Sequence, residues 1–227
     1  MVKCLLWAEA GNTMASVRGT SRFFNLPEDK RDRIIAAATT EFATHGYEQA
    51  NTNWIAKDAG ISVGALFKYF PTKADLFLYM VQRGSAIIEA KTAPILQSDA
   101  SPLEMIDKLI DIIGETSITE RESIQIYHAM GTPGDRAFIK ETAAELEQYT
   151  AKQYLTVIKR GQEIGEIRAD VPAEFLALLV DNQFVSLQYT LATEYYEERR
   201  HIYAADLPTD QLFETTKRFL HSALAAR

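Results

Sequence analysis

Cysteine is nearly absent from this chain: Cys4 is the only cysteine among 227 residues. A single thiol excludes a disulfide within the chain, and it excludes the paired-cysteine patterns of zinc sites. The four histidines are scattered, and no two of them have the spacing of metal ligands. We therefore expect no metal site and no cofactor. The low cysteine count is compatible with a reducing compartment such as the cytoplasm.

Long apolar runs are also missing. The run over residues 175–180 has six residues, far short of the roughly 20 that cross a bilayer. We therefore expect no membrane span. The N-terminal run over residues 4–8 is likewise too short for the core of an export signal. We expect residues 1–24 to form an unstructured extension, with either Met1 or Met14 as the true start.

Signatures of catalysis are absent as well. The sequence contains no Gly-x-Ser-x-Gly, no His-Glu-x-x-His and no glycine-rich phosphate loop ending in Gly-Lys-Ser/Thr. Asp107 and Asp111 are four residues apart, a spacing that on an amphipathic helix is typical of the solvated face. The chain is therefore not expected to be an enzyme.

The excess of positive charge that is usual in proteins that bind nucleic acid is missing too: the formal net charge is −7. The charge is unevenly spread, because residues 1–80 sum to +1 and the remainder to −8. An acidic body repels DNA except where the near-neutral N-terminal part meets it, which would limit non-specific binding. Acidic helices that only keep the protein in solution explain the body equally well.

Residues 51–70 have the pattern of two short helices joined by a tight turn. Asn51 and Ser62 are good N-caps, since each side-chain oxygen can accept a hydrogen bond from an unpaired amide of the first helical turn. Gly60 stands where the first helix must end, and glycine tolerates the left-handed backbone that closes a helix. Because so short a turn makes the two helices cross steeply, the pattern predicts a helix-turn-helix.

These two helices lie within a longer pattern over residues 33–79. It comprises residues 33–38, Phe42, Gly46, Tyr47, Ile55, Ala56, residues 59–62, Gly64, residues 66–70, Lys73 and Leu76. In order and spacing it resembles the DNA-binding domain of TetR-family transcriptional regulators. The resemblance implies an all-α fold, with a three-helix helix-turn-helix domain over residues 25–72. A larger helical domain for effector binding and dimerisation would follow over residues 73–227.

The second helix of the pair would face DNA. Its small residues allow close approach to base edges, while lysine and tyrosine side chains can reach phosphates. The resemblance places a further phosphate contact at Lys73, in the first turn of the next helix, where Thr72 and Asp75 form a capping box. The resulting DNA-contact set is Asn51, Thr52, Ser62, Val63, Gly64, Ala65, Lys68, Tyr69 and Lys73.

Four positions depart from the family pattern or stand out from it. Phe67 replaces a frequent tyrosine, so a hydroxyl that could bind phosphate is missing, and we expect the ring to be packed. Ala50 and Asn51 replace a pair of threonines. Asn51 can still cap the helix, but the phosphate contacts that the threonine hydroxyls would make are not expected here. Trp54 has two open interpretations, packing on the helix surface or contact near the DNA backbone.

Beyond residue 80 the sequence predicts further helices. One is expected to run from Lys73 to about Lys91 and to end before Pro94. Ser101 and Glu104 flank a proline in a capping box that starts another. The next starts after the break at residues 131–134 and ends in the turn-rich stretch 161–168. Asp170 and Pro172 open the following one.

The last two helices, predicted around residues 172–197 and 208–225, have wide apolar surfaces. The stretch over residues 175–180 is apolar around its whole circumference, so it must be covered on both sides. In the family these helices pack against their symmetry mates as a four-helix bundle, and we expect a homodimer. Burial inside a monomer is the alternative.

The expected function is that of a dimeric regulator that binds a palindromic operator in double-stranded DNA and is released by a small molecule. Repression is the usual role in the family, and we expect it here. A helical scaffold whose helix-turn-helix no longer binds DNA is the alternative. Aromatic and aliphatic side chains favour a hydrophobic or amphipathic effector. Candidate pocket residues have a polar tip on an apolar stem: Tyr127, His128, Tyr149, Tyr154, Asn182, Gln183, Gln188 and Tyr189.

Overall fold

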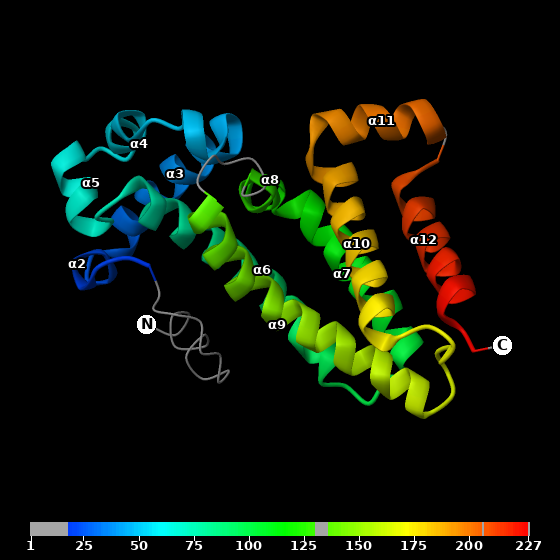
Figure 1. Ribbon diagram of the computed structural model, residues 1–227. Helices are drawn as coiled ribbons and strands as arrows, with labels where there is room; N and C mark the ends of the chain where they lie inside the picture. The colour runs from blue at the N-terminus through cyan, green and yellow to red at the C-terminus, as the bar shows by residue number, and fades with distance from the viewer. Residues whose placement is uncertain (1–17, 130–135, 206, 227) are drawn as a thin grey trace. The chain divides into compact units, whose positions relative to one another are not determined.

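A computed structural model describes residues 18–129, 136–205 and 207–226, without the side chains of residues 136–146 and 149. The regular elements of this part of the chain are all α-helices, as the sequence predicts (Figure 1). They are α2 (Ser21–Phe24), α3 (Glu28–Gln49), α4 (Thr52–Asp58), α5 (Val63–Tyr69), α6 (Lys73–Leu96), α7 (Pro102–Thr119), α8 (Arg121–Ala129), α9 (Arg136–Glu163), α10 (Ala173–Ala192), α11 (Glu194–Ala204) and α12 (Thr209–Leu224).

These helices form two compact units. Residues through Ile87 together with Gln125–Glu145 make up the first, and Ile88–Ile124 with the residues from Leu146 onward make up the second. The division therefore falls within α6 rather than at residue 72, where the sequence suggested it. The reason is that the first turns of α6 pack with the N-terminal helices: the Phe77 ring lies 5.1 Å from the ring of Phe42.

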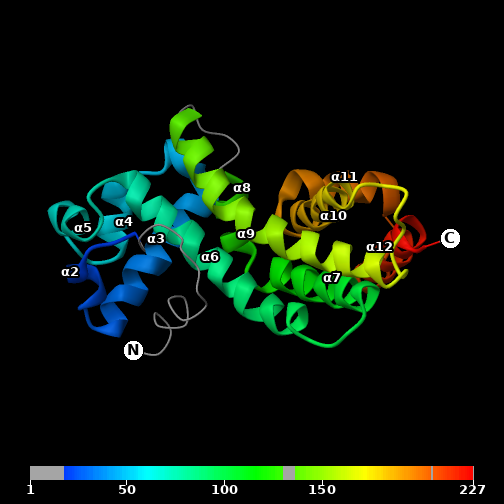
Figure 2. The ribbon, with the colours of Figure 1, turned by 60° about the horizontal axis from the view of Figure 1, so that its bottom comes forward.

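The first unit gathers α2 to α5 around the start of α6 (Figure 2). Its core is aromatic, with Phe23, Phe42, Phe70 and Phe77 fully buried. The burial of Phe23 corrects one expectation, since residues 21–24 are a helix and not part of an unstructured extension. The Phe23 ring packs 4.6 Å from that of Phe70, and this contact holds α2 in place. Residues 1–17, with Met1 and Met14, lie outside the described residues.

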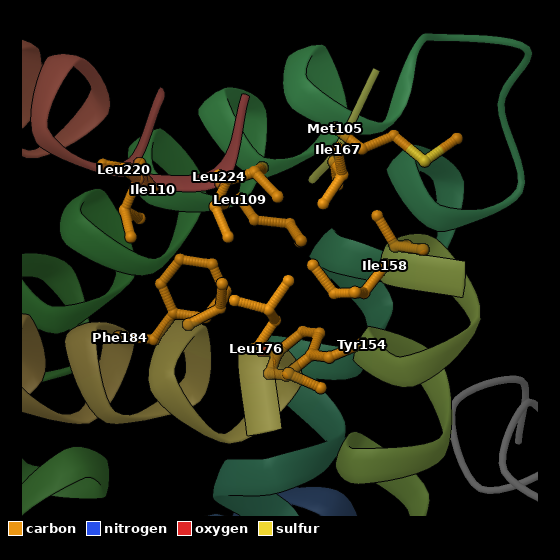
Figure 3. Packing of buried hydrophobic residues seen from close by; sticks show 14 of the residues in the cluster. Met105, Leu109, Ile110, Tyr154, Ile158, Ile167, Leu176, Phe184, Leu220 and Leu224 are labelled. Carbon is orange, nitrogen blue, oxygen red and sulfur yellow. The ribbon is translucent and has the colours of Figure 1, made fainter. Parts of the chain in front are cut away.

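The second unit is built around α7, α9, α10 and α12, whose apolar faces meet in one cluster (Figure 3). The expected capping box starts α7. Ser101 Oγ accepts from the Glu104 backbone N–H, and the Glu104 carboxylate accepts from the Ser101 backbone N–H. Burial of each large apolar side chain contributes roughly 1.5–3 kcal/mol. The labelled members of the cluster are Met105, Leu109, Ile110, Tyr154, Ile158, Ile167, Leu176, Phe184, Leu220 and Leu224.

Two predicted helix ends were wrong. Helix α6 continues through Pro94 to Leu96, although proline lacks one helical hydrogen bond; Ile95 and Leu96 pack on the apolar cluster and hold this last turn. The helix predicted over residues 172–197 ends at Ala192, because Thr193 takes an extended backbone with φ −122° and ψ 139°. A separate helix, α11, then links α10 to α12 (Figure 1).

The loop after α9 is tied to the end of α12. The backbone N–H of Arg168 donates to Leu224 O at 2.8 Å, and that of Ala226 donates to Glu166 O at 3.0 Å. The Ser101 hydroxyl donates to the Glu166 carboxylate at 2.6 Å. The starts of α7 and α10 and the end of α12 are thus joined through one loop. Among the described residues, no helix is long and apolar enough to cross a membrane.

Gly161 allows this loop to approach α9. A Cβ at position 161 would lie 2.5 Å from Cδ1 and 3.0 Å from Cβ of Ile167, which is fully buried and cannot move aside. We expect Gly161→Ala to lower the free energy of unfolding by about 1–3 kcal/mol, as overpacked cores do. Urea unfolding measures this loss. Gly64→Ala is the control, because a Cβ there meets no atom within 4 Å; equal stability of the two variants would contradict the prediction.

Candidate nucleic-acid interface

The two helices of the predicted helix-turn-helix are α4 and α5, and both N-caps form as expected. Asn51 Oδ1 accepts from the backbone N–H of Asn53 at 2.9 Å. Ser62 Oγ accepts from the backbone N–H of Ala65 at 3.1 Å. Each cap pairs an amide that the first helical turn leaves without a partner. The starts of both helices are therefore set by side chains within three residues.

The turn between α4 and α5 closes on Gly60. Its φ is +67°, in the left-handed region that favours glycine. The Gly60 N–H donates to Lys57 O at 3.1 Å, and the Ile61 N–H donates to Ala56 O at 2.9 Å. These two bonds make up the Schellman motif, which pairs carbonyls at the end of a helix. The direction in which α5 leaves α4 is set by this backbone geometry.

One side of the helix pair is buried and the other faces outward. Ile55, Ala56, Ala59 and Leu66 are fully buried against the aromatic core. On α5 and its cap, Ser62, Gly64 and Lys68 are exposed and Val63, Ala65 and Tyr69 are partly exposed. The outward side of α5 is thus made of small residues at its start and of lysine and tyrosine at its end. Asn51 is exposed and Thr52 is partly exposed at the start of α4.

Helix α2 holds the end of α5. The Thr20 backbone N–H donates to Tyr69 O at 2.9 Å, and the Thr20 hydroxyl donates to Lys68 O at 2.9 Å. Two of the last carbonyls of α5 are paired in this way. Sequence patterns did not indicate this contact, because Thr20 lies 48 and 49 residues before its partners.

Lys73 has partners that the sequence did not reveal. Its capping box forms, with Asp75 N–H donating to Thr72 Oγ1 at 3.0 Å and Thr72 N–H donating to the Asp75 carboxylate at 3.1 Å. The Lys73 ammonium donates to the backbone oxygens of Glu48 at 3.0 Å and Ala50 at 3.2 Å. Its expected contact with a phosphate stays a prediction.

Two exposed aromatic rings lie on α4 and α5. Phe67 is 40% exposed, so the expectation that its ring is packed was wrong; Leu66, one residue earlier, takes the buried position. Trp54 is 57% exposed, and the Lys57 ammonium lies 4.7 Å from its ring centroid. This stacking is a packing contact on the helix surface, and it leaves the ring accessible to a DNA backbone.

A family model described as bacterial regulatory proteins, tetR family, matches residues 34–80, which include α4, the turn, α5 and the start of α6. The N-terminal domain is a TetR-family helix-turn-helix domain. The HTH-type transcriptional repressor SCO4008 of Streptomyces coelicolor is 27% identical over 154 residues, which cover 68% of this chain and 76% of that protein. An HTH-type transcriptional regulator of Staphylococcus aureus is 29% identical over 102 residues, 45% of this chain and just over half (55%) of that protein.

Solved structures have a similar fold over most of the chain. The ketosteroid transcriptional regulator KstR2 of Mycobacterium tuberculosis covers 89% of this chain, and 98% of its own, with a TM-score of 0.65 at 19% identity. The fatty acid degradation regulator FadR of Bacillus halodurans covers 89%, and 100% of its own chain, with a TM-score of 0.70 at 17% identity. Each of these four proteins is named as a regulator or a repressor.

The candidate effector residues of this chain are divided between its two units. Tyr127 and His128 lie on α8 in the first unit, with their rings 5.5 Å apart. Burial lowers the pKa of His128 to about 4, so its imidazole is neutral near pH 7. The side chain of Tyr149 lies outside the described residues. Among the described residues, no group of three or more His, Cys, Asp or Glu side chains could hold a metal ion.

The remaining candidates lie on α9 and α10 in the second unit. Tyr154 is buried, with its ring 5.2 Å from that of Phe184. The Tyr189 ring packs 4.9 Å from that of Tyr196 on α11. Gln183 is partly exposed and Gln188 is buried. Asn182 is exposed on the outward side of α10, and its place in an effector pocket stays a prediction.

Asp181 is a polar residue that the sequence reasoning did not select. Burial, with a contribution from the charge of Glu147, raises its pKa to about 6 from an ordinary 3.8. Burial and the charges of Asp181 and Glu147 also raise the pKa of Tyr154. The sequence signal was present but ambiguous, because an acid directly after an apolar run also marks the edge of a buried face. A carboxyl group is thus held beside the Tyr154 and Phe184 contact.

The raised pKa of Asp181 predicts a pH-dependent loss of stability. Below pH 3.8 the carboxyl is protonated in both states; as the pH rises from 3.8 to about 6 the unfolded chain ionises first, so unfolding becomes easier. We expect Asp181→Asn to match the native chain near pH 4 and to be more stable above pH 6.5. Chemical unfolding across this range measures the difference. Equal free energies of unfolding for the native chain and Asp181→Asn at pH 7.5 would exclude the raised pKa of Asp181.

Proposed function

We propose that this chain is a dimeric, sequence-specific DNA-binding regulator that represses transcription from a palindromic operator. The observation that carries the proposal is the capped and closed pair α4 and α5, which exposes the start of α5 while its other side is buried. A helix held in this way can enter the major groove. Such a protein acts on chromosomal DNA in the cytoplasm. The alternative, a scaffold that does not bind DNA, predicts no binding at low salt.

The exposed side chains assign separate roles along α5. Ser62, Val63, Gly64 and Ala65 stand at its start, where their small size lets the backbone approach base edges. Lys68 and Tyr69 stand at its end and reach phosphate oxygens. Asn51 and Thr52 lie at the start of α4, which crosses the DNA backbone in this motif. Contacts with base edges would determine which DNA sequence is preferred, and contacts with phosphates would contribute affinity for any sequence.

Selection of bound duplexes from a random pool tests this assignment. The native chain is expected to recover a palindromic or near-palindromic sequence. Tyr69→Phe, which removes only the hydroxyl, should weaken binding to all duplexes by a similar factor. Val63→Thr should change the recovered sequence, because it alters a contact with base edges. Recovery of the same sequence at similar affinity by the native chain and both variants would contradict these roles.

Dimerisation is supported by apolar side chains that one chain leaves uncovered. Phe175, Leu178 and Leu179 on α10 and Phe219 on α12 are exposed, with Phe219 at 58%. The alternative of burial inside a monomer does not hold for these four residues. Both helices pack on α7 with their opposite sides, so the outward sides are available to a second copy. A two-fold pair of α5 helices would then contact half-sites about 34 Å apart, or a multiple of that spacing.

Charge placed on this outward side should separate the dimer. We expect Phe219→Glu to raise the dissociation constant of the dimer by about thirtyfold or more, which corresponds to about 2 kcal/mol for a central interface residue. Sedimentation velocity at several concentrations measures it. Ile164→Glu is the control, because Ile164 is similarly exposed at 60% but lies in the loop after α9. Equal dissociation of both variants would contradict the assigned interface.

Release by a small molecule completes the proposal. An apolar body with a few polar tips, such as Tyr154, Gln188 and Asp181, is the composition of a small-molecule site, and it favours a hydrophobic or amphipathic effector. Binding in the helical body would change the separation of the two α5 helices and block or release the operator. Operator affinity measured across a broad metabolite panel tests this step. Identical affinity with every compound would overturn it.

A further inference from the structure

Lys73 is bound to the end of α3 within its own domain. Its ammonium donates to Glu48 O at 3.0 Å and to Ala50 O at 3.2 Å. It also lies 4.8 Å from the ring centroid of Tyr47. A lysine ammonium has three N–H donors and no acceptor, so two of its three hydrogen bonds are made to backbone carbonyls.

These carbonyls suit a cation for a physical reason. The last carbonyls of a helix have no helical donor and form the negative end of its dipole. Here α3 is interrupted at Gly46, with φ 65° and ψ −179°, and Ala50 is already extended, with ψ 135°. The regular ladder therefore ends early, and a lysine from another helix supplies donors at this position. The aromatic face of Tyr47 adds a cation–π contact.

The contact joins two parts of the domain that are far apart in sequence. Residues 48–51 are the corner between α3 and α4, and Lys73 is the first residue of α6. The capping box of Thr72 and Asp75 holds the first turn of α6. A second bond, from Asn51 N–H to the Glu41 carboxylate at 2.8 Å, holds the corner from the side of α3.

We propose that Lys73 is a positioning residue: its ammonium fastens the first turn of α6 to the α3–α4 corner and so sets the position of α4 on DNA. The role in DNA binding rests on the proposed function, whereas the contact itself does not. The competing role is a direct bond to a phosphate. The two roles differ in how binding responds to salt, because only a cation that neutralises a phosphate releases a counterion.

Salt dependence of binding separates the two roles. Binding of the full chain to a 30-base-pair random-sequence duplex is measured by fluorescence anisotropy at several salt concentrations. Lys68→Met, which removes an exposed lysine of α5, should lower the slope of log affinity against log salt by about 1. Lys73→Met should lower affinity by about tenfold, for a lost charge-assisted hydrogen bond, with an unchanged slope. Lys73→Arg should restore most of the affinity, since its guanidinium can donate to the same carbonyls.

Two results of this comparison would overturn the proposal. One is a slope for Lys73→Met that falls by about 1, as for Lys68→Met, since that marks a phosphate contact. The other is unchanged affinity, which would show that the fastening has no effect on DNA binding. No binding by the native chain at low salt would instead overturn the proposed function and leave the contact to the next measurement.

Hydrogen exchange of the DNA-free chain tests the contact by itself. We expect Lys73→Met to raise exchange of the backbone amides of residues 50–55 at least about tenfold, while amides of the second unit keep their rates. Lys73→Arg should stay near the native rates. Uniform acceleration in both units would show a general loss of stability, and unchanged exchange at residues 50–55 would show no fastening; either result overturns the proposal.

Discussion

The backbone at Gly60 is the constraint on which the DNA-binding face depends. Its φ of +67° lets the chain reverse within a few residues, and the two Schellman bonds hold α4 closed at that point. A residue with a Cβ would resist this conformation. Because the Ser62 cap of α5 stands only two residues after Gly60, the turn decides which side of α5 is buried through Leu66 and which side is left exposed.

The pair α4 and α5 is held by three sets of contacts. Thr20, the N-cap of α2, pairs two carbonyls at the end of α5. Phe70, directly after α5, is buried in the aromatic core. Lys73 binds the α3–α4 corner, from which α4 starts. Each of these supports lies in the first unit. Helix α6 is one continuous helix that belongs to both units. Because Lys73 in its first turn is hydrogen-bonded to the α3–α4 corner, a change in this turn affects the corner from which α4 starts.

Charge and apolar surface are distributed differently in the two parts of the chain. Residues 1–80 are nearly neutral, whereas the remainder carries a formal charge of −8. The acidic part also exposes Phe175, Leu178 and Phe219 on α10 and α12. Large exposed apolar side chains are typical of a surface that is covered in the functional assembly. An acidic body favours contact of DNA with the nearly neutral N-terminal part, while its exposed apolar sides are suited to a second copy.

The sequence by itself determined the features that depend on neighbours within about four residues. The caps at Asn51, Ser62 and Ser101 and the turn at Gly60 are of this kind. The sequence also indicated the all-helical fold and the family of the N-terminal domain, because these depend on patterns repeated along the chain. Only the tertiary structure decided where distant residues meet. It buried Phe23 in a segment expected to be unstructured, and it broke the expected long helix at Thr193. It also brought Lys73 to the carbonyls of residues 48 and 50, and it raised the pKa of Asp181. The burial of Phe23, the hydrogen bonds of Lys73 and the desolvation of Asp181 depend on residues from other helices. A local sequence pattern therefore cannot predict them.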